Sequence, residues 1–246
     1  MLRWNGLKVL SILPARRQES CDAGSDVALF HGILHILMWE GWIDRAYIDA
    51  HTEGFDALMP GPVEQDLRVI SSPLDFYGVN YYNPTRIAGP STPAPEGSPM
   101  SADGLPFVML PVEGYPVTDF GWPVVPDGLR DVLVGLRREY GDALPPVVVT
   151  ENGCAYDDPP GPDGAIHDPR RTDYLASHLR AVGEAVGAGV DVRGYFTWSL
   201  LDNFEWAEGF TKRFGLVHVD YATQRRTPRD SYGWYRDVIA AHRASR

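Results

Sequence analysis

The sequence Thr150-Glu151-Asn152-Gly153 places a carboxylate directly after a run of valines, Val147–Val149. The valine run predicts a short buried strand, and the glycine predicts a turn after it. In a (β/α)8 barrel, residues that follow the strands at their C-terminal ends form the active site. A carboxylate there can attack a sugar carbon or polarise a water molecule. The alternative is an acidic residue that only ends a surface strand, and these four residues do not separate the two interpretations.

Two further segments favour the catalytic interpretation. They are Asp75–Tyr82, which contains Asn80-Tyr81-Tyr82, and the long segment Gly194–Asp220. Together with Thr150–Gly153, in this order and at this spacing, they resemble the motifs of glycoside hydrolase family 1, the β-glucosidase family. The resemblance is strongest from residue 67 to residue 246.

The resemblance implies roles for seven side chains. Glu151 matches the nucleophile that forms a covalent glycosyl–enzyme intermediate. Tyr82 matches the residue whose hydroxyl hydrogen-bonds that carboxylate and favours its charged form. The other five match residues that line the sugar pocket, and they are Asn80, Trp198, Glu205, Trp206 and Phe214.

Three of these residues imply a class of substrate. Glu205 matches a carboxylate that accepts hydrogen bonds from the outer sugar hydroxyls. Trp206 matches an indole that donates to these hydroxyls, and Trp198 matches an indole that lies under the sugar ring. Family members that act on 6-phosphorylated sugars carry serine in place of Glu205, because a carboxylate repels phosphate. The resemblance therefore implies hydrolysis of terminal, non-phosphorylated β-D-glycosides in carbohydrate catabolism, with glucose, galactose and fucose all left open.

Retaining hydrolysis needs a second carboxylate, which protonates the leaving oxygen. In the family this is the Glu of an Asn-Glu-Pro sequence, and no Asn-Glu-Pro occurs in these 246 residues. The chain is therefore interpreted as the C-terminal half of such an enzyme. Two hypotheses stay open: part of a retaining β-glucosidase, or a truncated, inactive fragment or weak sugar-binding half-barrel. The half-barrel would need an N-terminal partner half or would self-associate through its open sheet edges.

Strand-like and helix-like segments alternate along the chain, which is typical of parallel α/β architecture. Strands are expected at residues 7–13, 75–81, 147–150 and 192–198, and helices at 26–38, 126–140, 172–188 and 231–242. The segment Asn83–Trp122 is rich in Pro, Gly and Ser and predicts a long loop.

Two of the expected helices carry apolar residues at helical spacing. The stripes are Leu129, Val132, Leu133 and Leu136 in the first, and Leu175, Leu179, Val182 and Val186 in the second. Asp127 is expected to cap the first of these helices and Gly141 to end it.

The expected fold is one α/β domain over residues 1–246, a partial (β/α)8 TIM barrel of four βα units. By resemblance these are strands 5–8 of the complete barrel. Four strands cannot close at the tilt and stagger of an eight-stranded barrel, so the sheet is expected to be open, with unpaired edges and an exposed inner face.

Composition excludes several other function classes. The net charge of −11 argues against binding to nucleic acid or to an anionic membrane. Two cysteines, Cys21 and Cys154, give no disulfide framework, and the seven histidines show no metal-ligand spacing. No cofactor is expected, because two carboxylates suffice for glycoside hydrolysis. The N-terminal residues do not resemble a signal peptide, so a cytoplasmic location is expected.

Overall fold

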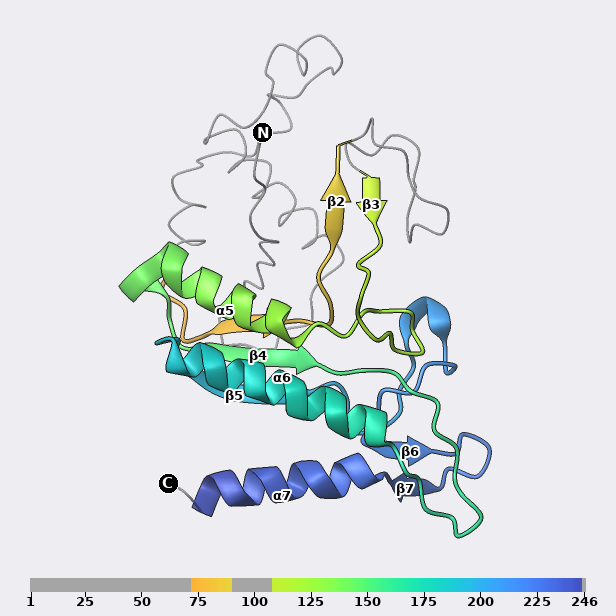
Figure 1. Cartoon of the computed structure of the whole chain (residues 1–246). Helices are drawn as coiled ribbons and strands as arrows, with labels where there is room; N and C mark the ends of the chain where they lie inside the picture. The colour runs from red at the N-terminus through yellow and green to blue at the C-terminus, as the bar shows by residue number, and fades with distance from the viewer. Residues whose placement is uncertain (1–71, 90–107, 245–246) are drawn as a thin grey trace, which may run out of the picture. The chain divides into compact units, whose positions relative to one another are not determined.

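The computed structural model describes residues 72–89 and 108–244, and the described residues from Phe76 onward lie in one compact unit (Figure 1). The strand expected at residues 7–13 and the helix expected at 26–38 lie outside the described residues. None of the helices in the described ranges combines the length and the apolar character needed to cross a membrane.

A three-stranded parallel sheet forms the centre of this unit. Its strands are β1 (Tyr77–Asn80), β4 (Val147–Asn152) and β5 (Val192–Thr197), in the spatial order β1-β4-β5. Strand β4 is central, and its residues Val147 and Val149 are fully buried. Because the strands are parallel, their C-terminal ends meet at one edge of the sheet.

Helices connect these strands and cover one face of the sheet. The chain runs from β1 through α5 (Pro126–Tyr140) to β4, and through α6 (Pro169–Gly187) to β5 (Figure 1). A third helix, α7 (Asp230–Ala244), contacts α6. Side chains from α5, α6 and the covered face of the sheet form the main core, which includes Val79, Leu129, Leu133, Val147, Val149, Val182 and Ala185.

The predicted stripes are correct in part. Leu129 and Leu133 of α5 are fully buried, but Val132 is 41% exposed. In α6, Leu175 and Val182 are buried as predicted, whereas Val186 is 48% exposed. The reason is that the buried face of α6 is centred on polar and small residues, which an apolar pattern overlooks: Arg171, Tyr174, His178, Ala181 and Ala185.

The ends of α5 give one confirmed prediction and one correction. The helix begins with proline at its first turn, a position that needs no backbone N–H donor. Its N-cap is Val125, with no side-chain hydrogen bond, so the prediction that Asp127 caps the helix is wrong. Gly141 ends α5 as predicted, with a φ of 54°, a conformation that glycine adopts without steric cost.

Two short antiparallel ladders lie outside the parallel sheet. Strand β2 (Arg86–Ala88) pairs with β3 (Val108–Leu110) inside the segment predicted to be a loop, and β6 (Val217–Val219) pairs with β7 (Arg226–Pro228). Each strand has three residues, too few for a periodic pattern to be recognised. Short 3₁₀ turns occur at Gly141–Ala143 and Trp206–Glu208.

Within the described residues the parallel sheet is open, since β1 and β5 each have β4 as their only strand neighbour. Its second face, on the side away from the main core, carries exposed aromatic side chains. Phe196 of β5 is 62% exposed, and Phe76, just before β1, is 44% exposed. The α/β architecture with parallel strands and an open sheet is as predicted.

Candidate active site

The C-terminal edge of the sheet brings Glu151 and Tyr82 together. Glu151 lies near the end of β4, where its neighbour across the ladder is Asn80 of β1. The backbone N–H of Tyr81 donates to the carbonyl of Glu151 at 2.9 Å, which extends the pairing past the end of β1. Tyr82 then donates its hydroxyl to Glu151 Oε2 at 2.8 Å. Adjacent strand ends therefore fix this pair.

The surroundings of Tyr82 keep its hydroxyl protonated. Burial raises the pKa of Tyr82 well above its ordinary value, and the hydrogen bond to Glu151 raises it further. The negative charges of Glu151 and Glu205 act in the same direction. A phenol that stays protonated remains a hydrogen-bond donor to the carboxylate, and such a bond favours the ionised form of an acid.

The turn after Glu151 packs closely against the end of β5. A Cβ atom at Gly153 would lie 1.9 Å from the carbonyl oxygen of Trp198, so only glycine fits there. The backbone N–H of Trp198 donates to the carbonyl of Asn152 at 2.9 Å. These contacts place Trp198 beside the strand end that carries Glu151.

Trp198 and Glu205 also contact each other. The indole Nε1 of Trp198 donates to Glu205 Oε2 at 3.4 Å, and Asn203 Nδ2 donates to the same oxygen at 3.0 Å. Asn203 was not predicted. Its position two residues before Glu205, inside the segment that carries the resemblance, was the available signal.

Phe214 is almost fully buried and forms an aromatic wall next to Tyr82. Its ring centroid lies 6.2 Å from that of Tyr82 and 6.0 Å from that of Trp122. Trp122 stacks on Phe120 at 4.1 Å. Trp206, in contrast, is 82% exposed. The structure therefore brings Phe214 to the Glu151–Tyr82 pair and leaves Trp206 in solvent.

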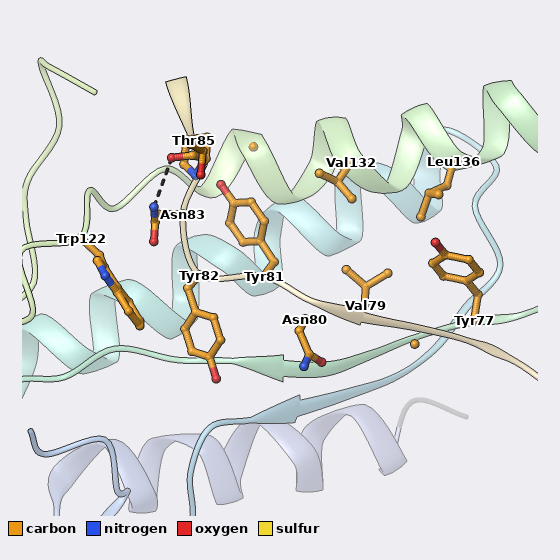
Figure 2. Close-up of a pocket in the computed structure, with 13 residues that line it drawn as sticks. Tyr77, Val79, Asn80, Tyr81, Tyr82, Asn83, Thr85, Trp122, Val132 and Leu136 are labelled. Carbon is orange, nitrogen blue, oxygen red and sulfur yellow. Dashed lines mark hydrogen bonds between the residues drawn. The ribbon is translucent and has the colours of Figure 1, made fainter. Parts of the chain in front are cut away.

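Asn80 is held at the same sheet edge. Its side-chain oxygen accepts a hydrogen bond from the Thr150 hydroxyl at 2.6 Å. Asn80 and Tyr82 also line an open groove of about 490 Å³ between β1 and α5 (Figure 2). In Figure 2 the ring of Tyr82 points toward β4, whereas the ring of Tyr81 points toward α5. Glu151 is not among the residues that line this groove.

The loop that carries Glu205 is anchored at its base by a buried carboxylate. Asp202 accepts hydrogen bonds from the backbone N–H groups of Gly215 at 2.9 Å and Val219 at 3.1 Å. It also pairs with Arg229 at 3.1 Å and with Arg213 at 3.4 Å. Burial lowers the pKa of Arg229 from its ordinary value, and Asp202 opposes that shift. Asp202 thus has a structural role.

A second buried arginine joins the loops after β4 and β5. Arg171 of α6 is 1% exposed and pairs with Asp168 at 2.9 Å. Its guanidinium also donates to four backbone carbonyls, those of Cys154, Tyr156, Arg213 and Phe214. Sequence analysis did not predict this role, because arginine is rarely buried and no pattern marks the exception.

Comparison with known proteins agrees with the motifs. Residues 26–244 match the sequence profile of glycosyl hydrolase family 1. The chain is 41% identical over 182 residues to beta-glucosidase A of Thermotoga maritima, covering 74% of this chain and 38% of that protein. It is 47% identical over 186 residues to a bifunctional beta-D-glucosidase/beta-D-fucosidase of Bifidobacterium breve, covering 73% of this chain and 40% of the relative.

Solved structures give the same result. A family 1 β-glucosidase from Thermotoga maritima superposes with a TM-score of 0.65 and 39% identity, over 76% of this chain and 39% of that one. A further structure of a Thermotoga maritima family 1 β-glucosidase, in complex with isofagomine lactam, has a TM-score of 0.64. The chain thus spans about 40% of the length of the curated relatives that it matches.

Proposed function

This chain belongs to glycosyl hydrolase family 1, and we propose that it supplies the nucleophile half of a retaining β-glucosidase site. The observation that carries the proposal is the 2.8 Å hydrogen bond from Tyr82 to Glu151 at the C-terminal edge of the sheet. Barrel enzymes carry out their chemistry at this edge. The resemblance of Thr150–Gly153 to a family motif, in which Glu151 matches the nucleophile, supports the proposal.

In the proposed reaction, Glu151 Oε attacks the anomeric carbon while a general acid protonates the departing glycosidic oxygen. The products of this first step are the free alcohol and a glycosyl ester of Glu151. Water, deprotonated by the conjugate base of the same acid, then cleaves the ester, releases the sugar with its original configuration and restores the Glu151 carboxylate. The hydrogen bond from Tyr82 holds the Glu151 carboxylate in place before the attack.

In this proposal, the loop after β5 recognises the sugar. Glu205 would accept hydrogen bonds from the outer hydroxyls, with its carboxylate oriented by Trp198 and Asn203. Charge-assisted hydrogen bonds of this type contribute roughly 1.5–3 kcal/mol each. Trp198 would lie under the apolar face of the ring, Trp206 would donate from its indole, and Asn80 and Phe214 would complete the wall. A carboxylate at this position favours unphosphorylated glucosides, galactosides or fucosides.

The general acid must come from residues other than these 246, because they contain no Asn-Glu-Pro sequence. We therefore propose that the described sheet corresponds to the C-terminal part of the barrel, and that the remaining units complete it. Two features support this. Aromatic residues are exposed on the open face of the sheet. A groove of about 580 Å³ also runs between β5 and α7, and is lined by apolar residues such as Leu200, Leu216, Tyr232 and Ile239.

The alternative is that the 246 residues form an inactive fragment or a weak sugar binder. Loss of general acid catalysis alone reduces rates about 10²–10⁴-fold, and loss of half the pocket removes positioning as well. The chain by itself is therefore expected to show no useful turnover. Sugar binding without turnover, in the presence of the rest of the barrel, would favour the alternative.

A chimera tests the proposal. This chain replaces the segment that it matches in beta-glucosidase A of Thermotoga maritima, so that the relative supplies the remaining barrel units. We expect turnover of an aryl β-glucoside that Glu151→Gln reduces by several orders of magnitude. Glu208→Gln, on an exposed loop carboxylate, is the matched control and keeps the activity. A folded chimera without turnover, or one in which Glu151→Gln stays active, would contradict the proposal.

A further inference from the structure

The side chain of Asn152, the residue after the proposed nucleophile, is fully buried and hydrogen-bonds in three directions. Its Nδ2 donates to the backbone carbonyl of Tyr81 at 2.7 Å and to the hydroxyl of Tyr174 at 3.1 Å. Its Oδ1 accepts from the hydroxyl of Tyr195 at 2.5 Å. One amide thus joins β4 to the end of β1, to α6 and to β5.

This network continues to the residue that contacts Glu151. The hydroxyl of Tyr174 donates to the backbone carbonyl of Tyr82 at 3.4 Å. Asn152 therefore holds the backbone carbonyls of both Tyr81 and Tyr82. It binds the first directly and the second through the Tyr174 hydroxyl. The backbone N–H of Tyr81 is held by the Glu151 carbonyl. The direction in which the phenol of Tyr82 leaves the chain is fixed by these bonds.

The two supporting tyrosines keep their roles over a wide pH range. Burial raises the pKa values of Tyr174 and Tyr195 well above the ordinary value, so both hydroxyls stay protonated. A buried polar network in which each member has partners makes the arrangement rigid, whereas one missing partner leaves a buried group unsatisfied. Within the described residues, Asn152 has no polar side-chain atom left without a partner.

We propose that Asn152 is the positioning residue for the Glu151–Tyr82 pair. The side-chain amide of Asn152 holds the backbone at the end of β1. In this way it directs the Tyr82 hydroxyl toward the carboxylate of Glu151. Tyr174 and Tyr195 support this residue from α6 and β5. The catalytic consequence of this role rests on the proposed function. The positioning of Tyr82 itself can be tested without measuring turnover.

The test measures the exchange of the Tyr82 hydroxyl proton with solvent in the 246-residue chain. Tyrosine labelled with ¹³C at Cζ reports this exchange by NMR through the deuterium isotope shift, and Tyr82→Phe assigns the signal. We expect Asn152→Asp and Tyr174→Phe to accelerate the exchange about tenfold or more, because each leaves buried groups unsatisfied. Tyr195→Phe is expected to have a smaller effect in the same direction.

Tyr235→Phe is the matched control, because it removes a hydroxyl that donates to the Tyr195 backbone at 3.1 Å and does not touch Asn152. It should leave the exchange at Tyr82 within about twofold of wild type. The Val219 amide, held by Asp202, reports global opening in each variant. If Asn152→Asp does not fold, Tyr174→Phe and Tyr195→Phe provide the test of the proposal.

Unchanged exchange at Tyr82 in folded Tyr174→Phe and Tyr195→Phe variants would overturn the proposal. Equal acceleration in Tyr235→Phe would also overturn it, because the effect would then be a general loosening. In the chimera described above, Tyr174→Phe is expected to lower kcat about tenfold and to leave KM within about twofold. Failure of the chimera to turn over a glucoside would count against the proposed function and would leave the exchange result intact.

Discussion

Glu151 and Tyr82 stand on the ends of adjacent strands, whereas Glu205 and Trp206 stand on a loop that projects beyond the sheet. On the strand side, the carboxylate and the phenol are already hydrogen-bonded, and the backbone that carries them is held by a buried network around Asn152. On the loop side, Glu205 is oriented by two side chains of its own loop, and Trp206 is 82% exposed.

This difference shows which part of the proposed site the described residues complete by themselves. The Glu151–Tyr82 pair is held by the ends of strands β1 and β4, and groups on strands are positioned more precisely than groups on loops. The recognition loop, defined here as residues Trp198–Phe214, is anchored at its base by buried Asp202 and Phe214. Three aromatic side chains nearer its tip, Phe204, Trp206 and Phe210, are each more than half exposed.

The largest effect is expected at the base of the recognition loop. Asp202→Asn should reduce the free energy of unfolding by about 3–5 kcal/mol, because it leaves the buried guanidinium of Arg229 without its counter-charge. Urea denaturation measures this change. Glu208→Gln removes an exposed carboxylate of the same loop, 4.0 Å from Lys212, and should cost less than about 0.5 kcal/mol. An equal loss of unfolding free energy in the two variants would show that Asp202 does not anchor the recognition loop.

A pH effect is expected on the strand side. His178 stacks on Tyr174 at 3.9 Å, donates to the Tyr174 carbonyl and is also close to the ring of Tyr81. Burial lowers the pKa of His178 to about 4 from its ordinary 6.5. Between these values the unfolded chain binds a proton that the folded chain does not. Stability contributed by neutral His178 is therefore present above pH 6.5 and lost as the pH falls toward 4.

The loss by pH 4 should be on the order of 3 kcal/mol. Urea titrations at a series of pH values between 7 and 4 measure it. His178→Asn keeps a donor for the Tyr174 carbonyl but cannot titrate, so its stability should fall less steeply over this window. A parallel decline in wild type and variant would refute the assignment to His178.

The contact between the two regions gives a third prediction. Gly153→Ala would force the carbonyl of Trp198 away from the end of β4, and overpacking of this kind costs about 1–3 kcal/mol. Gly183→Ala in α6, where no atom lies within 4 Å of the new Cβ, should instead stabilise the protein by up to about 1 kcal/mol. Thermal unfolding of both variants compares them, and a tolerated Gly153→Ala would show that strand and loop are not tightly joined.

The smallest effect on stability is expected at the tip of the recognition loop. Trp206→Ala removes an exposed side chain and should change the free energy of unfolding by less than about 0.5 kcal/mol. In the chimera the same substitution should raise KM, because the indole is proposed to contact the sugar. A loss of stability above about 1 kcal/mol would show that the tip is packed, and the contrast between the two regions would then fail.

The sequence was sufficient to predict the parallel α/β fold and the residues that meet at the strand ends. The valines before Glu151 identified β4, and the resemblance of Asn80–Tyr82 to a family motif pointed to the phenol that contacts Glu151. The first prediction depends on a local pattern, a buried β-branched run, and the second on a short motif recognised by its resemblance to a family.

The missed features depend on contacts between distant segments. Arg171 is a charged residue of a type that is usually exposed, and only tertiary structure shows its buried partners. Strand β6 left a weak signal, since buried Val217 and Val219 flank His218, but three residues were too few to separate it from a loop. The buried face of α6 passes through His178 instead of Val186, because stacking on Tyr174 and a hydrogen bond, which an apolar pattern does not count, hold the imidazole in the interior.

The most direct test of the central claim is to identify the residue that becomes covalently attached to the sugar. The chimera is incubated with a 2-deoxy-2-fluoro-β-glucoside bearing a dinitrophenyl leaving group, which needs little acid assistance, and is digested for mass spectrometry. We predict that the glycosyl label is found on Glu151 and disappears in Glu151→Gln. A label on Glu205 or on any other carboxylate would contradict the assignment of Glu151 as the nucleophile.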